Sequence, residues 1–257
     1  MTWNLWWRFG PDWQARQPAI LSTLETVGPD LLGLQEVWAH EGTTQADRLA
    51  AALGMHAAFA APSYPAPPSP PERPDQDGVD LGVALLSRWP ILRVRREPLP
   101  AAAAPEPVAL LATIDHPTGQ LHVAVSCVDH GLDHTAQRAA QNRALAALLS
   151  DQRLDGPLPV LLTADLNAAP DAPEMHPLTG ALLDTWPGNG DGGHTLSSGN
   201  PSAEHDSWLI DRRIDYVLAR PGSPGHTVAV EGAFLAGHPV AGVYPSDHYA
   251  VVSDLRT

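Results

Sequence analysis

The stretch Val160–Asn167, with the sequence VLLTADLN, joins an apolar run of strand length to a carboxylate and an amide. A short continuous apolar run of this kind is typical of a strand that is covered on both faces of its sheet. Asp165 and Asn167 stand two residues apart where the run ends, so both side chains can point into one cavity. In isolation, a turn formed by this aspartate and asparagine is the simpler explanation.

Similar runs and several helical patterns surround this stretch. Two consecutive runs between residues 108 and 128 have no helix between them, which predicts antiparallel neighbours in a mixed sheet. The sequence therefore predicts an α/β fold with strands in the core and helices outside it. The expected strands are Leu31–Val37, Leu81–Leu86, Val108–Ile114, Leu121–Val128, Val160–Thr163, Ile214–Leu218, Thr227–Val230 and Tyr249–Val252, and the expected helices are Gln14–Thr26, Thr44–Leu53 and Thr135–Leu149.

The chain has 257 residues, of which 44% are apolar and 17% charged, and it contains no run of apolar residues long enough to span a membrane. We expect a single domain over residues 1–257, with a proline-rich surface loop at about residues 62–76. The first residues lack the pattern of a signal peptide, so we expect a cytoplasmic protein. Cys127 is the only cysteine, which excludes an intrachain disulfide and a cysteine-rich zinc site.

The charge is strongly negative, because fifteen basic residues, all arginine, stand against twenty-nine acidic ones, for a net charge of -14. This balance disfavours long nucleic acid as a partner without excluding it. It suits a protein that gathers carboxylates around a divalent cation, although an acidic, well-solvated surface gives the same total. Arg93, Arg95 and Arg96 form the only local concentration of arginine. Arg93 and Arg95 could line up on one face of a strand, although a solvated edge strand is the simpler explanation.

Polar residues occur where other expected strands end or should be buried. Asn4 follows Thr2 and Trp3, where an amide can cap a turn. In Leu31–Val37, alternation places Glu36 on the same face as the apolar leucines at positions 32 and 34. A carboxylate on an apolar face must be paired, protonated or bound to a cation, so Glu36 is a candidate metal ligand.

Two further segments carry charged groups beside expected strands. Alternation places Arg213 and Asp215 on one face of their strand, where an internal salt bridge is the simplest explanation. Asp247 and His248 are adjacent in a turn before the last strand. Each of these pairs is weak evidence alone. Together they place acids, amides and histidines at the ends of strands that are spread over the whole chain.

His130 and His134 have the i, i+4 spacing of a zinc site on a helix. Gly131 and the strand before it argue against a helix across both histidines, and no H-E-x-x-H pattern accompanies them. We therefore expect His134 at a helix start or on the surface, and keep a zinc hydrolase using His130 and His134 as a less favoured alternative.

Seven segments in order give the sequence a family resemblance. They are TWNLW, LLGLQEV, LGVALLSRWP, CVDHGL with Arg138 and Gln141 downstream, LLTADLN, RIDYVL and SDHYAVV. This series, from Thr2 to Val252, resembles the endonuclease/exonuclease/phosphatase superfamily of metal-dependent phosphoesterases. The resemblance implies a four-layer α/β sandwich, in which two mixed β-sheets pack face to face with helices outside. It also implies a hydrolase acting on phosphoric ester bonds.

The resemblance assigns a metal site and a base to particular residues. Glu36 would bind the catalytic Mg2+ or Mn2+, with Asn4 and Asp247 beside the metal. Asp165 would position and deprotonate the attacking water. Asn167 would hold the phosphoryl group.

Three other residues would act on the phosphate. His248 would contact the scissile phosphate and Asp215 would orient this histidine. His130 would donate to a phosphate oxygen, although its segment reads Val-Asp-His-Gly where Thr-His-Leu or Asn-His-Leu is usual. We add Arg213 as a further candidate phosphate contact. A hard, oxygen-ligated cation with these groups suits in-line attack of water on a phosphate ester.

The family motifs predict the reaction and leave the substrate open. The acidic balance favours a small phosphorylated molecule, a nucleotide or a phospholipid head group, and an endonuclease or exonuclease acting on DNA or RNA is the alternative. A non-catalytic binding module is a less favoured possibility. The sequence does not indicate an oligomeric state.

Overall fold

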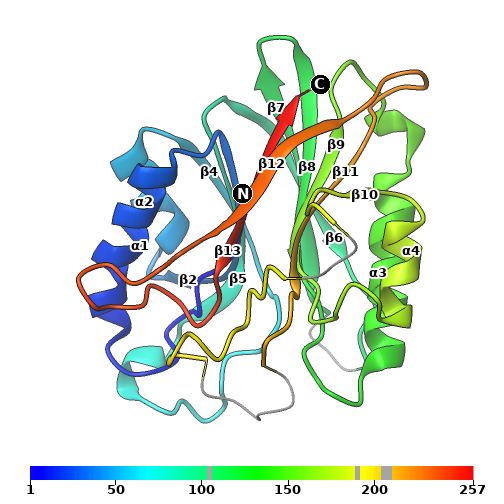
Figure 1. Cartoon of the computed structure of the whole chain (residues 1–257). Helices are drawn as coiled ribbons and strands as arrows, with labels where there is room; N and C mark the ends of the chain where they lie inside the picture. Colours follow the sequence, from blue (N-terminus) through cyan, green and yellow to red (C-terminus); the bar gives the residue numbers. More distant parts are fainter. Residues whose placement is uncertain (103–105, 189–191, 204–209, 257) are drawn as a thin grey trace.

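Two β-sheets pack face to face and carry helices on their outer sides, which gives four layers (Figure 1). The computed structural model describes residues 1–102, 106–188, 192–203 and 210–256. In Figure 1, α1 and α2 cover one sheet on the left, and α3 and α4 cover the other on the right. The predicted four-layer sandwich is confirmed.

The first sheet has the strand order β12-β13-β1-β2-β5-β4, with β3 paired to β2. Strands β1 and β2 are parallel and their other neighbours are antiparallel, so this sheet is mixed as expected. Its strands are β1 (Thr2–Asn4), β2 (Leu31–His40), β3 (Thr43–Thr44), β4 (His56–Ala60), β5 (Asp80–Ser87), β12 (Ala229–Ala236) and β13 (Ala250–Arg256).

The second sheet has the order β10-β11-β9-β8-β7-β6 and is also mixed, because β8 and β9 run parallel. The antiparallel pairing predicted between residues 108 and 128 is that of β7 and β8. Its strands are β6 (Ile91–Pro98), β7 (Val108–His116), β8 (Gly119–Cys127), β9 (Val160–Asp165), β10 (Leu183–Asp184) and β11 (Asp215–Arg220).

The main helices agree with the predicted periodicity to within a residue or two. Thr44 caps α2 through a capping box with Asp47, and Gly28 and Gly54 end α1 and α2 with φ of 60° and 67°. The α-helices are α1 (Trp13–Val27), α2 (Gln45–Leu53), α3 (Thr135–Leu149) and α4 (His176–Thr179), and the 3-10 helices are η1 (Pro74–Gln76), η2 (Gln152–Leu154) and η3 (Pro173–Met175). Residues 61–73, before η1, form neither helix nor strand.

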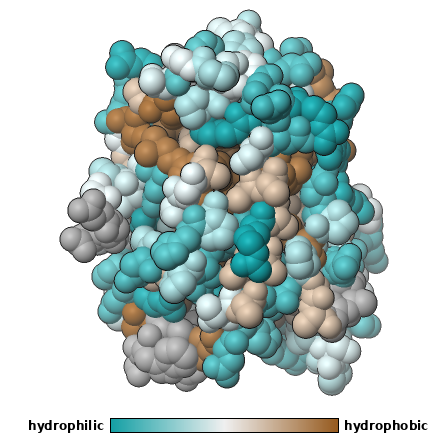
Figure 2. Space-filling model, turned by 90° about the vertical axis from the view of Figure 1, so that its right-hand side faces the viewer, coloured by the Kyte–Doolittle hydropathy of each residue, from teal (hydrophilic) through white to brown (hydrophobic). Residues whose placement is uncertain are grey.

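Three buried hydrophobic clusters lie between the layers and hold them together. Leu32 and Leu34 pack with Ile20 and Leu24 of α1, on the outer side of the first sheet. A second cluster joins the two sheets, and a third packs Leu145 of α3 against the outer side of the second sheet. Seen from the side of α3 and α4, the surface is mostly hydrophilic, with hydrophobic areas mainly in its upper half (Figure 2).

No helix in the described part of the chain is both long and apolar enough to cross a membrane.

Candidate active site

Asn4 connects the two sheets at the edge where β1 and β9 end, which is toward the lower end of the sandwich in Figure 1. Its amide nitrogen donates to Glu36 Oε1 at 2.8 Å and to Asp165 Oδ2 at 3.0 Å. Its side-chain oxygen accepts from the backbone N–H of Trp6 at 2.9 Å, which fixes the orientation of the amide. Asn4 is fully buried, so one amide holds carboxylates from both sheets at a fixed separation.

The backbone at Glu36 departs from regular strand geometry. The register between β2 and β5 shifts between Leu34 and Val37, and Glu36 has φ of 51°. The expectation that Glu36 shares the face of Leu32 and Leu34 is therefore wrong. The bulge ends the alternation and places the Glu36 carboxylate beside Asn4, away from the cluster that contains both leucines.

His248 and Asp215 form a buried pair, in which His248 Nδ1 lies 2.9 Å from Asp215 Oδ2. Asp215 begins β11 directly opposite Asp165 of β9, which brings two acids to the same edge. Thr195 fixes the backbone here, because its hydroxyl accepts from the N–H groups of Ile214 and Asp215. The pair therefore stands next to Asp165.

Asp247 lies in the segment before β13, and its carboxylate is close enough to Glu36 to act on it electrostatically. Ser246 anchors this segment, because its hydroxyl donates to the Asn4 carbonyl at 2.7 Å and lies 3.2 Å from Asp247 Oδ1. The indole N–H of Trp3 donates to the His248 carbonyl at 3.0 Å. Both contacts tie the segment to β1, so Asn4 and Asp247 border one acidic cluster.

The buried acids resist ionisation when no cation is bound. Burial, with Asp247 and Asp165 nearby, raises the pKa of Glu36 to about 8, against the opposing effects of Asn4 and His248. Burial, together with Asp215, raises the pKa of Asp165 to about 7. A carboxyl group whose pKa lies near neutrality is suited to accept a proton from water.

The His248 imidazole has the opposite preference. Burial alone would lower its pKa, but Asp215, Asp247 and Asp165 raise the pKa well above its usual value. The neighbouring acids therefore favour the imidazolium form of His248. Because Nδ1 faces Asp215, Nε2 is the ring nitrogen left to donate to another group.

Asn167 and the end of β8 form the neighbouring wall. The Asn167 N–H donates to Asp165 Oδ1 at 3.0 Å, and its side-chain amide donates to the Val128 carbonyl at 3.1 Å. Two residues beyond Val128, His130 is exposed and its ring lies 6.5 Å from the ring of Tyr64 in an edge-on arrangement. The segment that carries His130 is thus bound to the strand end that carries Asp165.

His134 lies outside this cluster. Its Nδ1 lies 2.9 Å from Asp129 Oδ1, and helix α3 begins only at the next residue. His134 therefore stands at a helix start, as expected, and the two histidines do not share a helix. A metal-like group of three histidine, cysteine or acidic side chains that includes both His130 and His134 is absent from the described residues.

Arg213 differs from its expected placement. β11 begins only at Asp215, so strand alternation does not extend to Arg213, and the prediction that both side chains share a face is wrong. The Arg213 guanidinium binds Asp184 at 2.7 Å and lies over the ring of Tyr216 at 4.6 Å. Asp215 instead contacts His248.

Arg16 is a buried residue that the sequence did not single out. Its guanidinium donates to the carbonyls of Leu5, Trp6, Trp7, Phe9 and Pro245. Burial lowers the pKa of Arg16 to about 10, while Asp247 and Glu36 act in the opposite direction. Arg16 is therefore charged at neutral pH, and it holds together the two loops that flank Asn4 and Asp247. In the sequence it looks like any polar residue of an amphipathic helix.

The donor set fits a hard divalent cation. Glu36 Oε2 and Asp215 Oδ1 are buried, and neither has a hydrogen-bond partner among the described residues. Buried carboxylate oxygens require a proton, a donor or a cation. Asp165, Asp215 and His248 also place ligand atoms within 4.8 Å of one another. Oxygen-rich clusters of this kind are the sites that Mg2+ and Mn2+ prefer.

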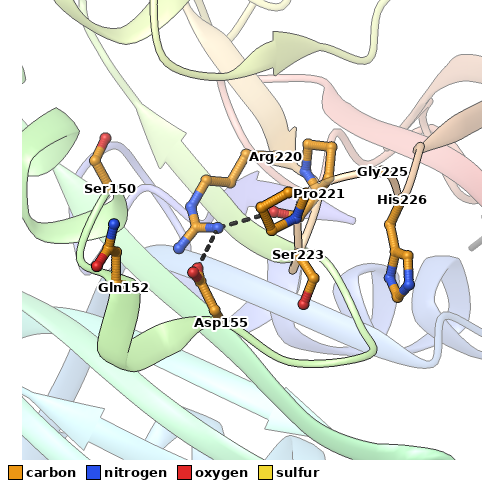
Figure 3. A pocket seen from close by; sticks show the side chains of 9 residues that line it. Ser150, Gln152, Asp155, Arg220, Pro221, Ser223, Gly225 and His226 are labelled. Atoms are coloured by element: carbon orange, nitrogen blue, oxygen red, sulfur yellow. Dashed lines mark hydrogen bonds and ion pairs between the residues drawn. The ribbon is translucent and has the colours of Figure 1, made fainter.

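A separate surface pocket of about 310 Å³ lies at the other end of β11 (Figure 3). Arg220 in this pocket binds Asp155 at 2.9 Å and donates to the Pro221 carbonyl. Arg220 stands five residues from Asp215, roughly 16 Å along the strand. This pocket is therefore remote from the acidic cluster.

The protein is a four-layer α/β sandwich with a buried acidic cluster where strands of both sheets end. The chain belongs to the endonuclease/exonuclease/phosphatase family, whose model matches residues 1–248. Members of this family are hydrolases that act on phosphoester bonds, and they generally use divalent metals. No curated protein matches the sequence.

Solved structures support the same fold. TDP2 from D. rerio, in complex with a single-strand DNA product, has a TM-score of 0.78 at 18% identity, with 100% of this chain and 97% of that chain covered. An endonuclease/exonuclease/phosphatase from Beutenbergia cavernae has a TM-score of 0.75 at 24% identity, covering 99% and 70%. The human Nocturnin catalytic domain with a bound sulfate anion has a TM-score of 0.68 at 20% identity, covering 95% and 86%.

Proposed function

We propose that the protein hydrolyses a phosphodiester or phosphomonoester with the help of Mg2+ or Mn2+. The observation that carries this proposal is the Asn4 amide, which bonds to Glu36 of one sheet and Asp165 of the other. The bridge supports a site in which Glu36 binds the metal beside Asp165 as the base. The bond from Ser246 to Asn4 supports Asp247 as a second ligand. Asn4 itself donates through nitrogen, so its main task is to position both acids.

A bound divalent cation supplies positive charge for the phosphate oxygens and for the group that leaves. Asp165 accepts a proton from the attacking water through a carboxyl group whose pKa lies near 7 in the metal-free protein. The Asn167 N–H and the Asn4 amide hold the two oxygens of Asp165, so the base keeps one orientation. Fixed orientation lowers the entropic cost of attack.

His248 supplies the second positive charge. Asp215 holds Nδ1, so Nε2 donates to a non-bridging phosphate oxygen as negative charge accumulates there. His130 and the amide of Asn167 border the same region and are candidate contacts for the phosphoryl group. Arg213 is occupied by Asp184, and we give it no direct role in binding phosphate.

For the substrate, we favour a small phosphorylated molecule, a nucleotide or a phospholipid head group. The net charge of -14 repels a long polyanion, and only fifteen arginines are available to oppose it. A nuclease is the second candidate. It is favoured by the TDP2 structure with its single-strand DNA product, which covers this entire chain.

The proposal is tested by incubating the protein with phosphomonoesters, phosphodiesters, phospholipids and oligonucleotides in Mg2+, Mn2+ or chelator. We expect cation-dependent turnover of at least one class, with the small substrates preferred over oligonucleotides. Preference for oligonucleotides would show that the substrate is a nucleic acid and not a small phosphorylated molecule. Turnover in chelator that equals turnover in Mg2+ would contradict the metal-dependent reaction itself.

A further inference from the structure

A second pocket, of about 400 Å³, lies on the outer side of β6, β7 and β8. Arginines 93, 95 and 153 line it together with Thr113, Gln120 and His122. Among the described residues, none that lines this pocket is acidic. This composition contrasts with that of the whole chain, in which acids outnumber bases by twenty-nine to fifteen.

The strand register explains why these side chains gather. Arg93 pairs with Thr113 across β6 and β7, and Thr113 pairs with His122 across β7 and β8, which makes one row across three strands. Arg95 stands opposite Leu111, which belongs to the cluster under α3. The row therefore faces outward, on the α3 side of the sheet, and η2 brings Arg153 to it.

This pocket is separate from the candidate active site. His122 pairs with Val160 at the start of β9, whereas Asp165 ends that strand, so the two sites are roughly 16 Å apart along it. Asp165 also faces the opposite way, because it bonds to Asn4 of the other sheet. One ligand of ordinary size cannot reach both sites.

The pocket keeps donors available for a ligand. Arg95 and Arg153 pair with Glu97 and Asp151, respectively, each at 2.5 Å. Arg93 makes no hydrogen bond or ion pair with any residue that the structure describes. Of the three guanidinium groups that line the pocket, two are thus paired with carboxylates, while Asp115 stands opposite Gln120 at the border of the pocket without an ion pair to Arg93 in the described part of the chain. The Arg93 guanidinium is therefore the unpaired positive charge that the pocket offers to a ligand. Guanidinium groups present planar pairs of N–H donors that match phosphate oxygens.

The pocket in Figure 3 provides a contrast. Its single arginine, Arg220, is bound by Asp155 and by backbone carbonyls, so this pocket offers no free positive charge. A concave surface with an arginine is therefore not enough. The pocket on β6, β7 and β8 differs in its three arginines and in the hydroxyl and imidazole at its floor, where Thr113 Oγ1 lies 3.2 Å from His122 Nδ1.

We propose that the pocket formed by Arg93, Arg95 and Arg153 with Thr113 and His122 binds a phosphate or diphosphate group. The ligand is a compact phosphorylated molecule or a phosphate of a nucleic-acid strand. The site is independent of the phosphoester hydrolysis proposed above, because it shares no residue with the acidic cluster.

Isothermal titration of the full chain with inorganic pyrophosphate, in chelator and at low salt, tests this site. The Arg93→Ser/Arg95→Ser variant should bind pyrophosphate at least about tenfold more weakly than wild type, since two charge-assisted bonds are lost. Arg256→Ser is the matched control, because it removes an exposed arginine paired with Glu231 outside the pocket, and it should bind like wild type. Arg153→Ser should weaken binding as well.

A second titration with a single strand of ten thymidines separates the two sources of phosphate. Binding of this strand that depends on Arg93 and Arg95 would identify a nucleic-acid phosphate, and binding of pyrophosphate alone would identify a small molecule. Equal pyrophosphate affinity in wild type and Arg93→Ser/Arg95→Ser, or no binding at millimolar pyrophosphate, would overturn the site. Hydrolysis measured in parallel should be unchanged in these variants, so failure here leaves the proposed function untouched.

Discussion

At the scale of the residue, replacing His248 should lower the rate of hydrolysis far more than replacing an exposed histidine. His248→Ala removes the imidazolium that Asp215 holds, and we expect kcat to fall by about two to four orders of magnitude. His238→Ala, which removes an exposed imidazole beside Tyr249, is the control and should leave kcat unchanged. Steady-state kinetics on the best substrate of the panel measures both. A His248→Ala enzyme with near wild-type kcat would remove His248 from the mechanism.

Arg16 should matter through the loops that it holds. Arg16→Met leaves five backbone carbonyls without their donor, and we expect the free energy of unfolding to fall by about 3 kcal/mol or more. Arg143→Met changes an exposed arginine on α3 and serves as the control. Urea denaturation of both variants compares them. Equal stability of Arg16→Met and Arg143→Met would show that the carbonyls find other partners.

Sequence reasoning located the acids and missed what supports them. Glu36 and Asp165 could be chosen because a carboxylate within an apolar strand needs a partner wherever it points. The direction of the Glu36 side chain could not be predicted, because it depends on a bulge and on a positive φ at Glu36. A positive φ is usually indicated by glycine, and position 36 is not a glycine. The hydrogen bonds of Arg16 in the described structure all go to backbone carbonyls, which every residue has, so no partner residue type in the sequence indicates its role.

At the scale of the element, Gly33 sets how closely β2 approaches the second sheet. A Cβ atom at Gly33 would lie 1.9 Å from Thr163 Oγ1 and 2.6 Å from Thr163 Cβ. Gly33→Ala should therefore lower the free energy of unfolding by about 1–3 kcal/mol through overpacking. Gly232→Ala in β12, where a Cβ meets nothing within 4 Å, is the matched control. Thermal unfolding of both variants tests this prediction. A Gly33→Ala protein as stable as Gly232→Ala would show that the two sheets shift to accommodate the added methyl group.

Elements with a strong pattern were predicted well and short or edge elements were not. Helix α3 spans Thr135–Leu149 as expected, because its apolar positions repeat with helical period. The sequence did not indicate β4, whose alanines carry little strand preference, or β10, which is only two residues long. Arg213 was placed wrongly for a related reason, since the start of a strand depends on its neighbours as well as on its own residues.

At the scale of the whole molecule, the buried acids make stability depend on pH and on cations. Glu36 has a pKa of about 8 when folded and an ordinary value of 4.5, so the folded state holds the proton more tightly. The stability that this proton provides is lost as pH rises from about 5 to 8 in chelator. In Glu36→Gln this loss does not occur, because glutamine has no proton that titrates. We therefore expect the free energy of unfolding of Glu36→Gln, relative to that of wild type, to increase by about 2–4 kcal/mol from pH 5 to pH 8.

Urea denaturation at several pH values, with and without Mg2+, measures this difference. The comparison of two variants cancels groups that titrate equally in both, such as the N-terminal amine, whose pKa burial lowers to about 6. Added Mg2+ should stabilise wild type more than Glu36→Gln. A stability difference that stays constant from pH 5 to pH 8 would show that Glu36 titrates normally and is not confined with other acids.

The most direct measurement is hydrolysis by wild type and Glu36→Gln of the best phosphoester of the panel, each with Mg2+ and with chelator. Wild type should turn over only with Mg2+, and Glu36→Gln should lose at least about two orders of magnitude of that activity while it remains folded. Glu25→Gln, on the exposed side of α1, should behave as wild type. Wild-type activity in chelator, or full activity in folded Glu36→Gln, would contradict a cation-dependent phosphoesterase built on this cluster.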